Sequence, residues 1–248
     1  MQRFADRTAL VTGAASGIGQ ATAQRLAAEG ARLALADVNE EGLATTRRAC
    51  EAHGADVATS LVDVSDESAV SEWVTASAAS SGIDLVCNVA GILQFEDFRS
   101  TTLADFERII GVNLTGTFLV CREAMPHLLE REGNIVNITS TAALAGHPWT
   151  SSYSASKGGV LALTLTLAVE FGKLGVRTNA VAPGSIETPI QGAFKIPEGG
   201  DPKLIHRIMP LDRMRGPEHI AAAVAYLGSD DAAHVNGEVL RVDGGTLA

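Results

Sequence analysis

Short apolar or β-branched runs, each followed by a segment of helical character, recur along the whole chain. Seven of these runs are predicted as strands, at residues 9–12, 33–36, 57–62, 85–89, 135–138, 176–181 and 239–242. The intervening helical segments include residues 19–29, 40–52, 67–79 and 219–227. Runs that are apolar throughout are typical of parallel strands buried on both faces. With right-handed crossovers, the alternation predicts an α/β fold: a Rossmann-like, doubly wound parallel sheet of about seven strands in three α/β/α layers. Its ligand crevice would lie at the carboxyl ends of the strands.

The chain shows no break that would divide it. Its 248 residues, 46% of them hydrophobic, suffice for one core, and no Pro-, Gly- or Ser-rich linker interrupts them. We therefore expect residues 1–248 to form a single dinucleotide-binding oxidoreductase domain. The one long irregular stretch, about 184–210, is predicted to be a substrate loop or lid.

Composition narrows the possible partners and surroundings. A net charge of -10 disfavours nucleic acid. The longest apolar stretch, 158–171, contains Glu170 and is shorter than the roughly 20 residues of a membrane helix. The three cysteines are Cys50, Cys87 and Cys121, an odd number and far apart, which favours reduced core thiols. With no leader before the first strand, we expect a cytoplasmic protein with a small-molecule substrate, no membrane segment and no metal.

A glycine-rich turn follows the first predicted strand. Residues 12–19 read TGAASGIG and lead into a helical pattern. Glycines permit a tight turn and let backbone N–H groups approach a pyrophosphate, which the helix N-terminus also favours. Taken alone, the motif fits an ordinary turn equally. Asp37 ends the second strand 18 residues after Gly19, near the spacing at which an acid binds the adenosine ribose. A carboxylate there accepts ribose hydroxyls and repels a 2′-phosphate, which favours NAD over NADP.

The third and fourth strands also end in polar residues or glycine. Asp63 and Val64 follow the third strand, and Asn88 to Gly91 follow the fourth. Turn chemistry alone explains either group. Their expected position at one sheet edge is what indicates a site.

Tyr153 and Lys157 stand four residues apart, hence on one face of a helix. A tyrosine pKa near 10 leaves little phenolate at neutral pH, and a nearby cation lowers that pKa. One ammonium stabilises the phenolate too little to bring the tyrosine pKa near neutral, so a cationic nicotinamide ring would have to contribute. Such pairs are also common on exposed helices. Here the pair follows a strand that ends at Ser140.

Taken in order, these motifs resemble the short-chain dehydrogenase/reductase family, in its compact single-domain branch, over essentially the whole chain. The motifs are TGxxxGIG at 12–19, NVAG at 88–91, Asn113, Ser140, the Tyr153/Lys157 pair and Pro183-Gly184. Ser140 precedes Tyr153 by 13 residues, as is usual in the family. Val89 stands where many relatives have a second asparagine, and Ala143 where many have glycine; the first should affect the turn and the second the pocket rim.

The resemblance implies a role for each matching residue. Tyr153 would be the general acid/base, Lys157 would lower its pKa and hold the nicotinamide ribose, Ser140 would bind the substrate oxygen, and Asn113 would support a proton-relay water. The implied cofactor-binding residues are Gly13, Ser16, Gly17, Ile18, Gly19, Asp37, Asp63, Val64, Asn88, Ala90, Gly91, Tyr153, Lys157, Pro183, Gly184, Ile186 and Thr188.

The expected function is NAD(H)-dependent interconversion of a secondary alcohol and a ketone. One alternative is a 3-oxoacyl-thioester (acyl-carrier-protein) reductase, against which Asp37 counts because such enzymes usually take NADPH. Another is a non-catalytic, NAD-responsive binding protein, because fold alone does not guarantee chemistry.

The sequence predicts the substrate pocket and the oligomeric state in less detail than the cofactor site. The pocket would be lined near 147–149, by His147, Pro148 and Trp149, and by Ile190, Gln191, Phe194 and Ile196 of the loop. This mixture suits a cyclic, aromatic or steroid-like alcohol, and rim packing explains His147 and Trp149 equally well. The helix after Tyr153 has apolar residues around its whole circumference, from Val160 to Val169. Such a helix must be covered on both sides, which predicts a homo-oligomer; the family resemblance implies a tetramer.

Overall fold

The computed structural model describes residues 2–248, and all seven predicted strands are present in one parallel sheet. They are β1 (Thr8–Thr12), β2 (Arg32–Asp37), β3 (Val57–Leu61), β4 (Leu85–Asn88), β5 (Asn134–Ile138), β6 (Arg177–Pro183) and β7 (Val239–Val242). The strand order is β3-β2-β1-β4-β5-β6-β7. The order reverses between β1 and β4, and ligands of such sheets bind at this reversal, outside the carboxyl ends of the strands.

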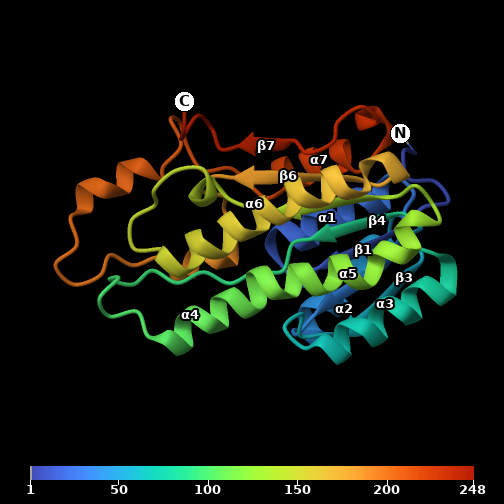
Figure 1. Ribbon diagram of the computed structural model, residues 1–248, viewed down its shortest axis with the longest axis horizontal. Helices are drawn as coiled ribbons and strands as arrows, with labels where there is room; N and C mark the ends of the chain where they lie inside the picture. The colour runs from blue at the N-terminus through green and yellow to red at the C-terminus, as the bar shows by residue number, and fades with distance from the viewer. Residues whose placement is uncertain (1) are drawn as a thin grey trace.

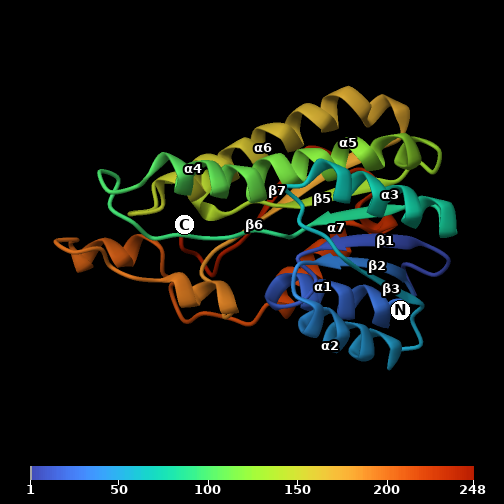
Figure 2. The same ribbon diagram turned by 90° about the horizontal axis from the view of Figure 1, so that it is seen from below.

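Helices cover both faces of the sheet, so the predicted three-layer fold is confirmed (Figures 1 and 2). One face carries α1 (Gly17–Ala28), α2 (Glu40–Glu51) and α7 (Glu218–Leu227). The other carries α3 (Glu67–Ser81), α4 (Leu103–Ile110), α5 (Gly116–Leu129) and α6 (Ser151–Phe171). Within residues 2–248, none of the helices has the length and apolar character needed to cross a membrane.

Alternation along the strands divides the core in two. In β1, Val11 packs into the cluster with α1 and α7, whereas its neighbour Leu10 packs into the cluster with α3 and α5. Both side chains are fully buried. Burying one such side chain stabilises the fold by about 1.5–3 kcal/mol. The three cysteines are buried and free, as expected, and burial raises the pKa of Cys50 to about 11.

Most of the fully buried residues of α6 are small. The buried stripe recurs every four positions, at Ser152, Ser156, Val160, Thr164 and Ala168. Leu167 packs against the core beside this stripe, whereas Leu165 is 43% and Val169 84% exposed. Small side chains let α6 lie close to β5 and β6, which brings its first turns to the crevice.

The residues of the predicted lid, 184–210, contain two 3₁₀ turns, at Pro189–Ala193 and Pro202–Arg207. They extend beyond the carboxyl ends of the strands, at the left of Figure 1 in orange. The chain's N-terminal segment lies at the opposite end of the sheet.

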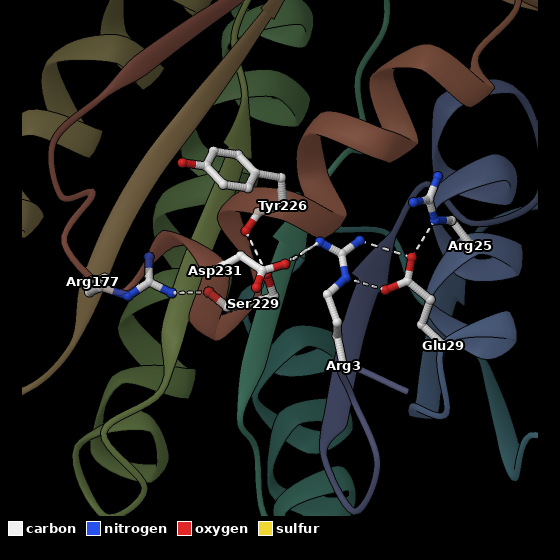
Figure 3. Close-up of polar contacts among 7 residues, drawn as sticks. All are labelled: Arg3, Arg25, Glu29, Arg177, Tyr226, Ser229 and Asp231. Atoms are coloured by element: carbon white, nitrogen blue, oxygen red, sulfur yellow. Dashed lines mark hydrogen bonds and ion pairs between the residues drawn. The ribbon is translucent and has the colours of Figure 1, made fainter. Parts of the chain in front are cut away.

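An ionic network closes that opposite end (Figure 3). The Glu29 carboxylate, 8% exposed, accepts hydrogen bonds from Arg3 and Arg25, and Arg3 also pairs with Asp231. The network ties the first residues of the chain to the end of α1 and to the turn after α7.

Arg177, at the start of β6, lies at the same end of the sheet and hydrogen-bonds backbone carbonyls there. Its guanidinium donates to the carbonyls of Leu227, Ser229 and Val235 at 3.1–3.2 Å. These include carbonyls left without an intrahelical partner at the end of α7.

Candidate active site

A cavity of about 420 Å³ lies at the carboxyl ends of the strands. It extends from the residues after β2 and β3 to the lid and the loop before α6. Of the predicted site residues, Asn88 and Asn113 do not line it. The others do: Gly13, Ser16, Gly17, Ile18, Gly19, Asp37, Asp63, Val64, Ala90, Gly91, Ser140, Tyr153, Lys157, Pro183, Gly184, Ile186 and Thr188. Residues that are distant in sequence thus meet in one site.

The turn between β1 and α1 requires its glycines. Gly13 has φ +66°, and a Cβ there would lie 2.7 Å from the Cα of Ala90. A Cβ on Gly19 would collide with the carbonyl oxygen of Gly13. The turn therefore packs closely against the end of β4 and exposes the N-terminus of the 12-residue α1 to the cavity. Backbone N–H groups and helix dipole suit the pyrophosphate of a dinucleotide.

The Asp37 carboxylate is held by backbone donors at the end of β2. The Ala15 N–H donates to Oδ2 and the Asn39 N–H to Oδ1, both at 3.0 Å. These bonds orient the carboxylate toward the cavity, where its remaining lone pairs can accept the two hydroxyls of a ribose.

Lys157 is buried without a counter-charge. It is 4% exposed, and its Nζ donates to the Ile138 carbonyl at 2.8 Å. Burial lowers the pKa of Lys157 to about 8. The Nζ lies 5.9 Å from the centre of the Tyr153 ring and also borders Gly91, so it lies between the catalytic tyrosine predicted on α6 and the turn after β4.

Tyr153 is paired with Ser140. Burial raises the pKa of Tyr153, and the hydrogen bond to the Ser140 side chain acts in the opposite direction. Ser140 follows β5, and its hydroxyl also accepts the Ala142 N–H at 3.1 Å, which fixes its direction. In the protein alone burial prevails, so a phenolate at neutral pH requires further positive charge, as from an oxidised nicotinamide.

Asn113 lies beneath the cavity, in a π-helical turn, Gly111–Thr115, between α4 and α5. Its amide donates to the Ile92 carbonyl and to Ser156 Oγ, both at 3.0 Å, and its oxygen accepts the Ile92 N–H at 2.8 Å. π-Helical turns inside helices often mark functional sites. Here the fully buried Asn113 joins the segment after β4 to α6.

Asn88 points into the sheet interior and away from the cavity. Its amide donates to Asn137 Oδ1 at 2.9 Å, and the Asn137 amide donates to Thr164 at 2.9 Å. This chain joins β4, β5 and α6. Asn88 does not line the cavity, and its side chain supports the strands that carry the site; its part in cofactor binding stays a prediction.

The predicted substrate pocket is found only in part. His147, Ile190 and Gln191 line the cavity, whereas Pro148, Trp149, Phe194 and Ile196 do not. Sequence reasoning missed other lining residues, among them Ile92, Leu93, Phe95 and Ile208. Their signal was available for the first three, because they continue directly from the NVAG turn.

Two contacts join the lid to the loop after β4. The rings of Phe95 and Phe194 meet edge to face at 5.1 Å, and Lys195 pairs with Glu96 at 2.9 Å. These contacts hold the predicted lid against the loop after β4.

Comparison with known proteins identifies the family. A family model described as "Enoyl-(Acyl carrier protein) reductase" matches residues 13–246. Levodione reductase of Leifsonia aquatica is 41% identical over 99% of this chain and 96% of its own, and its crystal structure superposes with a TM-score of 0.91 over 98% of both chains. The chain belongs to the short-chain dehydrogenase/reductase family.

Two further members agree with this assignment. The 3beta-hydroxysteroid dehydrogenase 1 of Eggerthella lenta is 40% identical over 96% of this chain and 93% of its own. A short-chain dehydrogenase from Mycobacterium paratuberculosis, solved bound to NAD, is 29% identical with a TM-score of 0.92 over 98% of both chains. The expected class, a short-chain alcohol dehydrogenase/ketone reductase, is thereby confirmed, as is a nicotinamide cofactor.

The residues of this chain fit such a cofactor. The glycine turn offers space and N–H donors, Asp37 offers acceptors at one end, and Lys157 offers an ammonium near the other. All three border the same cavity.

Proposed function

We propose that this short-chain dehydrogenase/reductase uses NAD(H) to interconvert a secondary alcohol and a ketone, with Tyr153 as the general acid/base. The convergence of Tyr153, Lys157 and Ser140 on one cavity, with Asp37 at its far end, carries the proposal. The assigned roles of Asn113 and of the other lining residues rest on the same family resemblance.

In reduction, the Tyr153 hydroxyl donates its proton to the carbonyl oxygen while Ser140 hydrogen-bonds that oxygen. The nicotinamide, when bound, supplies the hydride; in oxidation it accepts one. Lys157 then opposes the negative charge that forms on the phenol oxygen. In the oxidative direction the Tyr153 phenolate takes the hydroxyl proton of the alcohol.

Tyr153→Phe tests this mechanism. Loss of the proton donor should lower kcat about 10²- to 10⁴-fold, with NADH still bound, as measured by NADH absorbance and by fluorescence titration. Tyr226→Phe is the matched control, because Tyr226 lies on α7 and does not line the cavity. Near-normal turnover of Tyr153→Phe would show that another group moves the proton.

The preference for NAD over NADP is proposed from Asp37. Wild-type protein should bind NADH more tightly than NADPH, and Asp37→Ser should reduce that ratio about 10- to 100-fold, the value of a charge-assisted hydrogen bond. The matched control is Asp56→Ser, because Asp56 lies just before β3 and does not line the cavity. Tighter binding of NADPH by the wild type would favour the alternative activity, a 3-oxoacyl-thioester (acyl-carrier-protein) reductase.

We also propose a homo-oligomer, because Leu165 and Val169 leave an apolar surface on α6. Light scattering of the purified protein tests this; a monomer at micromolar concentration would contradict it. We propose as well that residues 184–210 act as a lid over the substrate and that the protein is cytoplasmic.

A further inference from the structure

Within residues 2–248, Lys157 beside Tyr153 is the one charged side chain that lines the substrate end of the cavity. Of the residues that line the cavity within 2–248, only Asp37, Asp63 and Lys157 carry charge. Asp37 and Asp63 follow β2 and β3, at the end opposite the lid, and Lys157 lies beside Tyr153. The remaining walls near the lid are largely apolar, formed by Ile92, Leu93, Phe95, Ile190 and Ile208.

Two of the charged side chains near this end are paired with a carboxylate. Lys195 of the lid pairs with Glu96 at 2.9 Å, and Arg99 pairs with Asp97 at 2.9 Å. A carboxylate or phosphate seated in the apolar end would therefore lose its hydration without gaining a cation, a costly transfer.

His147 is one of the polar residues of this wall, together with Gln191. It lines the cavity together with the apolar residues above, and neither of its ring nitrogens makes a hydrogen bond with residues 2–248. Its Nε2 is shielded from solvent, whereas Nδ1 is not among the shielded atoms. Burial lowers the pKa of His147 to about 4, so the imidazole is neutral at pH 7 and offers one donor and one acceptor.

Nδ1, the nitrogen of His147 that is not shielded, is the one that a ligand in the cavity can reach, and it makes no hydrogen bond with residues 2–248. A neutral imidazole matches a hydroxyl or carbonyl oxygen, and it supplies no charge for an anion. The reacting oxygen is already assigned to Tyr153 and Ser140. The oxygen that His147 would meet is therefore a second one, elsewhere on the substrate.

We propose that the substrate is an uncharged, compact and largely apolar ketone or secondary alcohol with a second oxygen, and that His147 determines specificity by hydrogen-bonding that oxygen. The proposal rests on the alcohol/ketone activity proposed above and specifies its substrate class.

Two matched pairs of ketones test it with the wild-type protein and NADH. 4-Hydroxycyclohexanone and 4-methylcyclohexanone have the same size and differ in the second oxygen. We expect the hydroxy compound to have a kcat/KM about three- to tenfold higher, the value of one neutral hydrogen bond. The methyl ester of 4-oxocyclohexanecarboxylate should exceed the free carboxylate by about 100-fold or more, since the carboxylate would be buried without a cation.

Variants then locate the effect. His147→Leu should abolish the preference for the hydroxy compound, and His147→Gln, which keeps a donor and an acceptor, should retain part of it. His206→Leu is the matched control, since His206 is an exposed histidine of the lid that does not line the cavity. Thermal unfolding checks that each variant is folded.

Each outcome has one meaning. An unchanged ratio in His147→Leu, or a wild-type preference for the methyl compound, overturns the role of His147. Preference for the carboxylate, or turnover confined to bulkier ketones of a wider panel, overturns the substrate class. Failure to reduce any ketone of that panel with NADH or NADPH overturns the proposed function itself.

Discussion

The two ends of the sheet bury charged side chains in opposite ways. At the amino end, the Glu29 carboxylate is held by two arginines (Figure 3). The Arg177 guanidinium at the same end is held by three carbonyls. At the carboxyl end, Lys157 is more deeply buried than any of these arginines, yet it has one carbonyl partner and no counter-charge.

The pKa values record the same difference. At the amino end, hydrogen bonds from Arg3 and Arg25 overcome the opposing effect of burial and hold the pKa of Glu29 below its usual value. At the carboxyl end, burial alone lowers the pKa of Lys157 and of His147. Fully paired groups contribute to stability, whereas incompletely paired groups cost stability and remain available to ligands.

Of the substitutions that test this difference, Lys157→Met should have the largest effect, on kcat. The expected loss in kcat is at least about 100-fold, because nothing in the protein would then oppose charge on the Tyr153 phenol. The melting temperature should stay equal or rise, since a buried cation without a counter-charge is removed. A large fall in melting temperature with kcat retained would reverse the roles of the two ends.

Glu29→Gln should show the opposite pattern. It leaves Arg25 without a carboxylate and Arg3 with Asp231 alone, at an expected cost of about 2 kcal/mol, less than for a fully buried pair because Arg25 is 41% exposed. The melting temperature should fall by several degrees with kcat unchanged. Arg7→Gln is the control: its partner Asp230 is 77% exposed, and the expected loss is under about 1 kcal/mol. Equal losses in both variants would contradict the distinction.

The pH dependence of the free energy of unfolding should also differ between groups at the two ends, with smaller effects than those of the substitutions above. His147 has a folded pKa of about 4 and an ordinary value of 6.5, so its neutral form favours folding above pH 6.5, and this stability is lost as the pH falls toward 4. Lys157 acts similarly at higher pH: stability is lost as the pH falls from 10.5 toward 8. The Glu29 contribution is lost only in more acidic solution, below 4.5.

Denaturant unfolding across this pH range measures each contribution. His147→Leu should lessen the loss between pH 6.5 and 4.5, Lys157→Met the change between pH 8 and 10.5, and Glu29→Gln only the loss in more acidic solution. Matching pH profiles for the wild type and all three variants would contradict the assignments.

Much of the fold was predictable because its signals are local. The seven strands were predicted to within about two residues of their observed ends, since a run of buried apolar side chains is visible in any short window. The glycine turn, Asp37 and the Tyr153/Lys157 pair follow from chemistry within single segments. For α6 the prediction was less good: its apolar pattern did not show that the sheet would contact serine, threonine and alanine.

The remaining features depend on segments that are far apart in the chain. Asn88 faces a cavity or Asn137 according to how β4 and β5 are paired, and residues 49 positions apart decide it. Likewise, which of His147, Trp149 and Phe194 reaches the cavity depends on the path of two loops and on the Phe95 contact.

The sequence by itself determined the elements, their alternation and the chemical groups available for a dinucleotide and a proton transfer, because propensity and spacing are local properties. Only the tertiary structure decided which buried groups are paired. Glu29 meets Arg3 across 26 residues, whereas Lys157 meets a carbonyl 19 residues away and no carboxylate. Burial makes that choice consequential, since a low dielectric strengthens each pairing and penalises each group left without one.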